Sequence, residues 1–215
     1  MLQVVSVNIG HIQPIQYARK SGETGIFKQP VAAPIQVTPL GLAGDAICDV
    51  KNHGGPDQAV YIYTLPDYAW WSQQLGRPLA PGEFGENLTL SELESAACSV
   101  GDRLRAGAVL LEVTAPRIPC STLAARMGDP AFVKRYRAAE RPGLYCRVLQ
   151  PGPVQPGDPV TLEPTSGPTL TILEMFRDYY ISNLDEAAIR RHLAAPIAIR
   201  ARMDMEKLLA QKHLT

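Results

Sequence analysis

The sequence predicts a mainly β fold, a barrel or a sandwich with a few short helices, followed by a small domain of three helices. The 215 residues include 17 Gly and 19 Pro, which implies many turns and few long helices. Short apolar runs recur between turn signals, a spacing that favours a barrel or sandwich over alternating βαβ units. After residue 168 the apolar spacing becomes helical.

Strands are predicted where a short run of β-branched, aromatic or other apolar residues is bounded by turn residues. Gly, Asn and Asp mark turns at 41–44, 52–57, 101–102 and 157–158. The predicted strands are Leu2–Ile9, Ile35–Thr38, Ala59–Thr64, Asn87–Leu90, Ala108–Thr114, Leu144–Leu149 and Pro159–Leu162.

Helices are predicted at two places in this β-rich part. The first, Pro66–Leu75, opens with proline and is stopped by Gly76. Ser121–Met127 and Pro130–Ala139 follow as one or two further helices.

The C-terminal part predicts three helices, at about 169–180, 184–193 and 203–213, with Pro196 between the last two. We therefore predict a division into residues 1–165 and residues 166–215. The helices are expected to pack against the β-rich domain. Docking of a partner protein and formation of a homodimer are the alternatives, suggested by Phe176, Tyr179 and Tyr180, which look exposed.

Composition and charge exclude several classes of protein. With 46% hydrophobic and 20% charged residues, the chain has the composition of a globular protein. It lacks an apolar run of the roughly 20 residues that a membrane span needs and a basic N-terminal leader. We therefore expect a cytoplasmic protein with no membrane partner. The formal net charge is zero, so no nucleic-acid partner is expected either.

Positive charge is nevertheless concentrated in one segment. Residues 103–147 carry 9 basic and 3 acidic side chains, a net charge of +6, whereas residues 1–102 carry 5 basic and 10 acidic ones. This asymmetry predicts an anion-binding region. For Arg135, Arg137 and Arg141, an exposed helix face is an equally good interpretation.

The four cysteines stand alone in the sequence. They form no C-x-x-C pair and no Cys/His pair at zinc-finger spacing, which argues against a structural zinc or an iron–sulfur cluster. In a cytoplasmic protein, disulfides are not expected. Cys48 and Cys146 lie in apolar, strand-like runs and are predicted to be core residues, whereas nothing distinguishes Cys98.

Cys120 lies in a different context. A strand is predicted to end at Thr114, Pro116 and Pro119 bracket Arg117, and Cys120 then precedes a helix. The helix dipole and the guanidinium both favour the thiolate, the form that attacks electrophiles or binds a soft metal. A reactive or metal-binding thiol is one interpretation, and a small buried residue between strand and helix is the other.

A second segment places polar side chains beside paired glycines. His53 precedes Gly54 and Gly55, whose backbone amides can approach a ligand anion, and Lys51 adds a positive donor. The alternative is a hairpin with a surface histidine.

A third segment, residues 82–90, reads GEFGENLTL. Here Glu86 or Asn87 either caps backbone amides or faces a ligand. Neither this segment nor the preceding one is a Walker or Rossmann phosphate loop.

Four segments, taken in their order along the chain, resemble the MOSC domain, the molybdenum cofactor sulfurase C-terminal family, over residues 1 to about 165. They are GLAGDAICDVKNHGGPDQAVYIY, FGENLTL, VGDRLRAGAVLLEVTAPRIPC and RPGLYCRVLQPGPVQPGD. With its helical tail, the whole chain resembles the YiiM-like branch of that family. The resemblance implies a MOSC-type β-barrel, a molybdenum cofactor of the molybdopterin type, and reduction of N-hydroxylated compounds. N-hydroxylaminopurine-type base analogues are the implied substrates, and detoxification the implied role.

The resemblance also implies roles for single residues. Cys120 matches the cysteine of the family's PR-x-PC motif and is the implied metal ligand and catalytic residue. Arg117 and Arg147 are the implied counter-charges for the pterin phosphate.

Residues of the two glycine-containing segments complete the implied site. The residues implied to bind the cofactor are Lys51, Gly54, Gly55 and Asn87. Those implied to take part in catalysis are His53 and Asn87.

The implied reaction removes the hydroxylamine oxygen with two electrons and two protons, giving an amine and water. Since the sequence shows no site for a flavin or iron–sulfur cluster, a separate electron-donor protein with one of these cofactors is expected. Two alternatives stay open: a non-catalytic carrier of the cofactor or of a Cys120 persulfide, and a metal-free hydrolase or transferase with Cys120 as nucleophile and His53 as base. Pyridoxal phosphate is not expected, because none of the six lysines stands in a context typical of a Schiff base.

Overall fold

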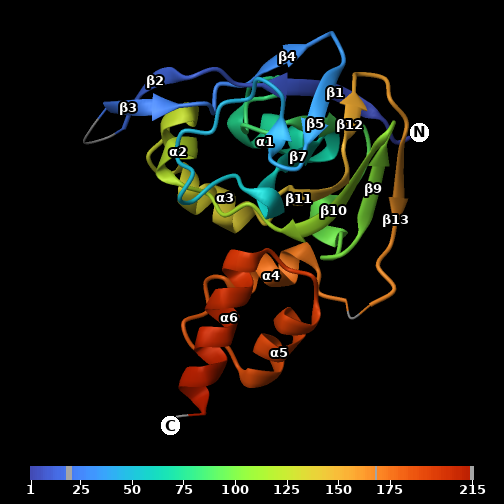
Figure 1. Cartoon of the computed structure of the whole chain (residues 1–215). Coiled ribbons are helices and arrows are strands. Elements are labelled where there is room, and N and C mark those ends of the chain that lie inside the picture. The colour runs from blue at the N-terminus through green and yellow to red at the C-terminus, as the bar shows by residue number, and fades with distance from the viewer. Residues whose placement is uncertain (18–20, 168, 214–215) are drawn as a thin grey trace.

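The structure is a computed structural model that describes residues 1–17, 21–167 and 169–213. Two residues considered above lie outside the described residues: Lys20, one of the six lysines, and Pro168, within the predicted C-terminal domain of residues 166–215. A β-rich body carries three C-terminal helices at one end (Figure 1). Of the described residues, 30% are helical and 29% are in strands, so the mainly β expectation is corrected to a mixed composition.

The elements follow one another as short strands with helices between them. The strands are β1 (Val4–Ile9), β2 (Gln13–Gln16), β3 (Ser21–Thr24), β4 (Gln29–Val31), β5 (Ile35–Thr38), β6 (Gly41–Leu42), β7 (Val60–Thr64), β8 (Leu88–Leu90), β9 (Arg103–Ala106), β10 (Val109–Ala115), β11 (Leu144–Gln150), β12 (Gly152–Val154) and β13 (Val160–Glu163). The helices are α1 (Leu65–Leu75), α2 (Ser121–Met127), α3 (Phe132–Ala139), α4 (Ile172–Asp178), α5 (Glu186–Ala194) and α6 (Ile199–Lys212), with short 3-10 turns at Pro56–Gln58 and Ser95–Ala97.

The main sheet has eight strands in the order β13-β9-β10-β11-β7-β8-β1-β4. All of its pairings are antiparallel except that of β7 with β8. All five residues of β7, VYIYT, are buried, as expected for a continuous apolar run at the centre of a sheet. Smaller sheets of β12-β5-β6 and β2-β3 complete the body.

The sheet is not a closed barrel, which corrects the barrel expectation. The start of β1 approaches the start of β13, where Val160 N donates to Leu2 O at 3.0 Å, but the only pairing assigned there among the described residues is the isolated bridge Gln3–Pro159. The other edge strand, β4, carries Pro30, which has no N–H to donate to a further strand. The sheet therefore curls without completing a ladder around its circumference.

All seven predicted strands are present, with ends shifted by at most two residues. Six further strands (β2, β3, β4, β6, β9 and β12) were not predicted, because segments such as QPIQ and SGET are polar and short. Their pairing depends on neighbouring strands more than on their own apolar pattern.

The predicted helices are also present, and their ends follow local chemistry. Thr64 caps α1 by accepting a hydrogen bond from Asp67 N, and Gly76 ends it in the left-handed conformation. Asp185 caps α5 in the same way, by accepting a hydrogen bond from Ala188 N.

Aromatic side chains fill the core between β7, α1 and α3. Trp71 packs on Tyr136 at 5.9 Å between ring centroids, and its indole N–H donates to the Tyr63 hydroxyl at 2.8 Å. The Tyr61 hydroxyl meets that of Tyr136 at 3.1 Å. These contacts hold β7, and with it the Tyr61 ring, in a fixed place.

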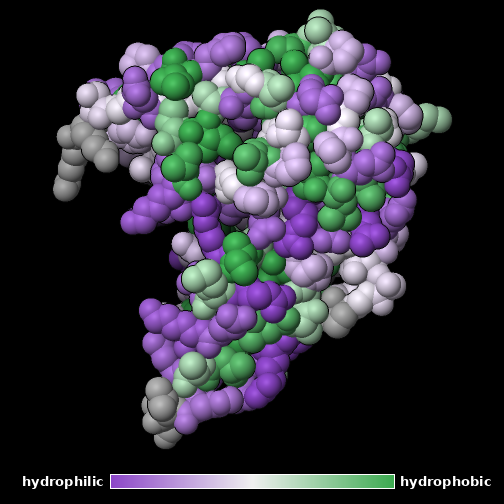
Figure 2. All heavy atoms as spheres, in the orientation of Figure 1, coloured by the Kyte–Doolittle hydropathy of each residue, from purple (hydrophilic) through white to green (hydrophobic). Residues whose placement is uncertain are grey.

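The C-terminal helices divide between two apolar clusters. Ile172 and Phe176 of α4 belong to the main core, which corrects the expectation that Phe176 is exposed, whereas Tyr179 is 63% exposed as predicted. Leu184 and Ile189 form a second small cluster with residues of α5 and α6. On the face shown in Figure 2, hydrophilic residues cover much of this helical end.

None of the helices in the described part of the chain has the length and apolar character required to cross a bilayer.

Candidate functional site

A pocket of about 680 Å³, partly open to solvent, lies between the segment 45–58 and the junction of β10 with α2. The residues that line it are Tyr17, Glu23, Thr24, Gly25, Ile26, Lys28, Asp45, Ala46, Ile47, Cys48, Asp49, His53, Gly54, Gln58, Tyr61, Gly85, Asn87, Arg117, Cys120, Thr122 and Tyr145.

Cys120 lies at the turn from β10 into α2, as the sequence predicts. It is the N-cap residue of α2, with extended backbone angles, and its side chain lines the pocket. Pro116 and Pro119 restrict the backbone between the strand and the helix. The thiol is thereby held at the pocket wall by local structure.

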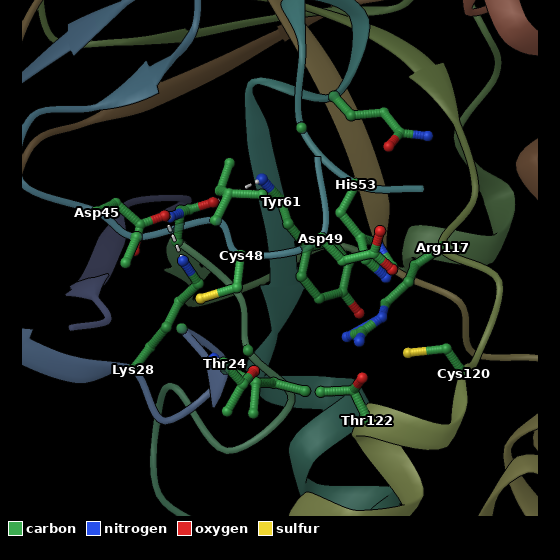
Figure 3. A pocket seen from close by; sticks show the side chains of 18 of the residues that line it. Thr24, Lys28, Asp45, Cys48, Asp49, His53, Tyr61, Arg117, Cys120 and Thr122 are labelled. Atoms are coloured by element: carbon green, nitrogen blue, oxygen red, sulfur yellow. Dashed lines mark hydrogen bonds and ion pairs between the residues drawn. The ribbon is translucent and has the colours of Figure 1, made fainter. Parts of the chain in front are cut away.

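The surroundings of the Cys120 thiol favour its charged form. Burial by itself would raise the pKa of the thiol, but hydrogen bonding by His53, the charge of Arg117 and the backbone N–H of Leu123 together lower it to about 6. In Figure 3 the Cys120 sulfur and the Arg117 guanidinium point toward each other, and His53 lies on the same side of the pocket. At neutral pH the thiol is therefore mostly a thiolate, which can act as a nucleophile or as a ligand of a soft metal.

Arg117 is 4% exposed and is held from two sides. One terminal nitrogen donates to Phe84 O, and the guanidinium lies 5.1 Å from the centroid of the Tyr61 ring. Its Nε is buried and has no hydrogen-bond partner among the residues that the structure describes. Because an unpaired buried donor is costly, an acceptor on a bound group that reached this atom would be stabilised.

His53 comes from the loop that precedes β7. Its backbone N–H donates to Asp49 O at 2.9 Å, and the next two residues, Gly54 and Gly55, have φ of 70° and 83°. A side chain at position 54 would also meet Ile47 at 2.9 Å. The glycines thus let the loop turn tightly so that His53 reaches the pocket.

Asn87 lines the opposite wall, but both ends of its side-chain amide are occupied. Its oxygen accepts from Tyr61 N at 3.1 Å, and its nitrogen donates to Asp45 at 2.8 Å. Asp45 in turn pairs with buried Lys28 and accepts from Gly10 N at 2.7 Å. Asn87 therefore holds the wall together rather than presenting a free amide to the pocket.

Glu86, the other candidate of that segment, is completely buried and accepts from Gly82 N at 2.7 Å, which is the first of the two alternatives, a cap on backbone amides. Sequence reasoning missed Lys28, Asp45 and Tyr61 as pocket residues. Asp45 follows a glycine-rich turn, GLAGD, which is the one local signal that could have drawn attention to it.

Three sequence-predicted site residues lie outside the pocket lining. Lys51 is exposed, and Gly55 borders a smaller cleft next to α6. Arg147 is engaged elsewhere, in ion pairs with Asp57 at 3.0 Å and Glu112 at 3.3 Å. The structure therefore brings together Cys120, Arg117, His53, Gly54 and Asn87 but not these three.

The remaining cysteines divide by burial. Cys98 and Cys146 are buried, as predicted for Cys146, and burial raises the pKa of Cys98 to about 12. Cys48 is exposed and lines the pocket, so its predicted core position is wrong: the run DAICDV that contains it forms a loop and not a strand.

No cluster of three or more His, Cys, Asp or Glu side chains that could hold a metal ion occurs in the described ranges. Cys120 offers one thiolate, which suits a metal that brings its other ligands within a larger cofactor. The unpaired Nε of Arg117 also fits a cofactor with acceptor groups.

Comparison with known proteins identifies the family. Residues 49–161, more than half of the chain, match the MOSC domain. The chain is 38% identical over 154 residues to the uncharacterized protein YflK of Bacillus subtilis, an alignment that covers 72% of this chain and 70% of that protein. It is 32% identical over 162 residues to protein YiiM of Escherichia coli, an alignment that covers 74% of this chain and 70% of that protein. A protein named reductase from Gibberella moniliformis is 32% identical over 160 residues, which are 72% of this chain and 28% of that protein.

The fold comparison extends the likeness to the C-terminal helices. The crystal structure of YiiM from Geobacillus stearothermophilus matches with a TM-score of 0.80 and 31% identity, covering 97% of this chain and 100% of that chain. The resemblance found in the motifs is thus confirmed, and the chain belongs to the MOSC domain family and to its YiiM-like branch.

Proposed function

We propose that the protein is a molybdenum-cofactor-dependent reductase of N-hydroxylated compounds, with N-hydroxylaminopurine-type base analogues as its substrate class. The observation that carries the proposal is the thiolate of Cys120 at the wall of a pocket that Arg117 and His53 also line. Membership of the MOSC family and the reductase name of one relative support the same class of chemistry.

The molybdenum cofactor, when bound, would supply oxygen-atom and two-electron transfer chemistry. Cys120 would hold its metal through the thiolate, and Arg117 would donate from its unpaired Nε to an acceptor of the pterin. The rigid wall formed by Tyr61, Asn87 and Asp45 would orient the bound molecules and exclude water from one side.

Reduction of an N-hydroxylated compound to an amine and water consumes two electrons and two protons. His53 lines the pocket beside Cys120 and is placed to deliver a proton to the departing oxygen. The electrons are proposed to come from a separate donor protein that carries a flavin or an iron–sulfur cluster.

The test uses the full chain produced in a host that makes the molybdenum cofactor. We expect bound molybdenum and pterin in about equal amounts, and reduction of 6-N-hydroxylaminopurine with dithionite-reduced viologen as electron donor. Cys120→Ser should lose both metal and activity, because a hydroxyl is a poor ligand for a soft metal. Cys98→Ser is the matched control and should keep both. Full activity of Cys120→Ser, or activity without molybdenum, would overturn the proposal.

A metal-free hydrolase or transferase is the second candidate, and the pairing of His53 with the Cys120 thiol favours it. This candidate predicts turnover of activated esters or thioesters by protein free of molybdenum and without an electron donor. A carrier of the cofactor or of a Cys120 persulfide predicts a bound group and no turnover in either assay.

A further inference from the structure

The first turn of α6 is tied to the loop that carries His53. The backbone N–H of Ile199 donates to Asp57 Oδ2 at 2.7 Å. Arg200 donates through one terminal nitrogen to Val50 O at 3.0 Å and through the other to the Gln58 side chain at 3.4 Å. The Arg200 guanidinium therefore joins the two ends of the segment 50–58, and His53 lies between them.

Asp57 is a second point of attachment, shared by the loop, the sheet and the tail. Its backbone O accepts from the Thr114 hydroxyl at 2.6 Å, and its carboxylate pairs with Arg147 at 3.0 Å. Arg147 also donates to Pro196 O at 3.0 Å and to Ile197 O at 3.2 Å, in the segment that leads into α6. One arginine on β11 thus fixes both the loop and the start of α6, which explains why it lies away from the pocket.

The loop itself has little intrinsic rigidity between these attachments. Gly54 and Gly55 both have a positive φ, and glycine has the largest conformational freedom to lose on ordering. The backbone bonds of Asn52 and His53 to Asp49 join residues of the same loop and do not attach it to the body. A small cleft remains between Gly54–Gln58 and Ala198–Arg200, so α6 approaches the loop without packing solidly against it. Besides its own hydrogen bond to Cys120, His53 therefore depends for its orientation on the polar contacts at the loop ends.

We propose that α6 serves as a positioning element for the site, and that Arg200 is a positioning residue that keeps the segment 50–58 in the conformation in which His53 faces Cys120. This inference rests on the proposed function for the importance of His53 in the reaction. The geometry itself does not depend on that function, so it is tested on protein without cofactor.

The first experiment is amide hydrogen exchange of the full-length, cofactor-free protein, followed by mass spectrometry of peptides spanning 49–58. In Arg200→Ala we expect exchange in this segment to rise by about tenfold, because a hydrogen bond from a charged donor is lost at each end of the loop. Arg200→Lys should recover part of the protection, since lysine keeps one donor and the charge. Arg190→Ala is the matched control: Arg190 is exposed and pairs with Glu186 inside α5, and its loss should leave the loop unchanged.

The second experiment separates positioning of His53 from general loosening. The rate of alkylation of Cys120 by iodoacetamide at one fixed pH is measured in the wild type, Arg200→Ala, His53→Ala and the double variant. If Arg200 acts through His53, Arg200→Ala changes the rate in the wild-type background and leaves it unchanged in the His53→Ala background.

Three results would overturn the inference: unchanged loop exchange in Arg200→Ala, an equal change in the Arg190→Ala control, or an equal effect of Arg200→Ala on alkylation in both backgrounds. None of these results depends on molybdenum. Failure of the reductase assay would therefore not affect the inference about Arg200. Failure of the Arg200 experiments would likewise not affect the reductase proposal.

Discussion

The thiol of Cys120 is partly buried, and yet its pKa of about 6 lies well below the ordinary value of 9.0 for a cysteine. Burial alone would give the opposite result, so the outcome depends on three neighbours: His53, Arg117 and the first turn of α2. Two of these neighbours are local in sequence, whereas His53 is brought in by the loop before β7. The thiolate is therefore a product of both local and tertiary structure.

The first prediction concerns the pH dependence of Cys120 alkylation in cofactor-free protein. The thiolate fraction rises with pH through the pKa, so the alkylation rate should rise with a midpoint near pH 6. In His53→Ala the lost hydrogen bond moves the midpoint upward, and the rate at pH 7 should fall by about two- to tenfold for a rise of one to two pH units. Peptide mass spectrometry follows Cys120 separately from the other cysteines.

Cys48 provides an internal control in the same samples. It lines the same pocket, but partial desolvation of this exposed thiol and the nearby Glu23 raise its pKa. Its alkylation midpoint should lie well above that of Cys120 and should not move in His53→Ala. Equal midpoints for Cys48 and Cys120 would contradict the assigned electrostatics.

A second prediction at this scale concerns Arg117. The Arg117→Lys substitution keeps the positive charge but removes the planar guanidinium. The contact of one terminal nitrogen with Phe84 O and the unpaired Nε are both lost with it. We expect molybdenum and pterin content to fall several-fold in protein from a cofactor-producing host, while the circular dichroism spectrum is unchanged. Arg135→Lys, at an exposed pair with Asp129, is the control. Wild-type cofactor content in Arg117→Lys would place the pterin contact elsewhere.

At the scale of elements, two left-handed glycines differ in the space around them. Gly76 ends α1 with φ of 64°, and nothing lies within 4 Å of an added Cβ. Gly143 precedes β11 with φ of 65°, and an added Cβ would meet Ile62 O at 2.6 Å and the rings of Tyr63 and Tyr61 at 2.7 and 2.8 Å. The second glycine is therefore required by packing as well as by backbone conformation.

We expect Gly76→Ala to lower the free energy of unfolding by about 1 to 2 kcal/mol, the cost of a left-handed alanine. Gly143→Ala should cost more than about 3 kcal/mol, because β11 and β7 must separate to accept the methyl group. Urea unfolding measures both values. Equal losses in the two variants would show that the contact with β7 relaxes freely.

At the scale of the whole molecule, the predicted division at residue 166 stays a prediction, and the packing makes its test specific. Leu170 and Phe176 belong to the main core, and Val100 N donates to Leu170 O at 2.9 Å. The cluster around Leu184 and Ile189, in contrast, is built mainly by α5 and α6. Loss of α4 and loss of α5 with α6 should therefore have different effects.

We expect a chain that ends at Glu163 to keep a β-rich circular dichroism spectrum but to be poorly soluble, because the surface under Phe176 becomes exposed. A chain that ends at Asn183 keeps α4 and should unfold at a higher temperature. Both lack α6, so both should show the fast exchange of segment 50–58 expected for Arg200→Ala. If only the longer chain folds, the boundary of the β-rich domain lies after α4.

The sequence alone determined the local features of this protein. Cys120 lies at a strand-to-helix turn that nearby residues define by themselves. A strand ends before the prolines that flank Arg117, and a helix begins after them. The central strands and all six helices were likewise predictable, because their apolar spacing and caps lie within a few residues. The order of the motifs also identified the family.

Tertiary structure decided what depends on residues distant in sequence. The Lys28–Asp45–Asn87 network and the contacts of Arg147 follow from strand register and loop path, which local propensity does not encode. Arg147 has the charge expected of a phosphate ligand, yet the pairing of β11 directs it toward Asp57 and the start of α6. Whether the sheet closes into a barrel also depends on contacts between residues distant in sequence. Edge strands such as β4 have too little apolar pattern for their pairing to be predicted from the sequence.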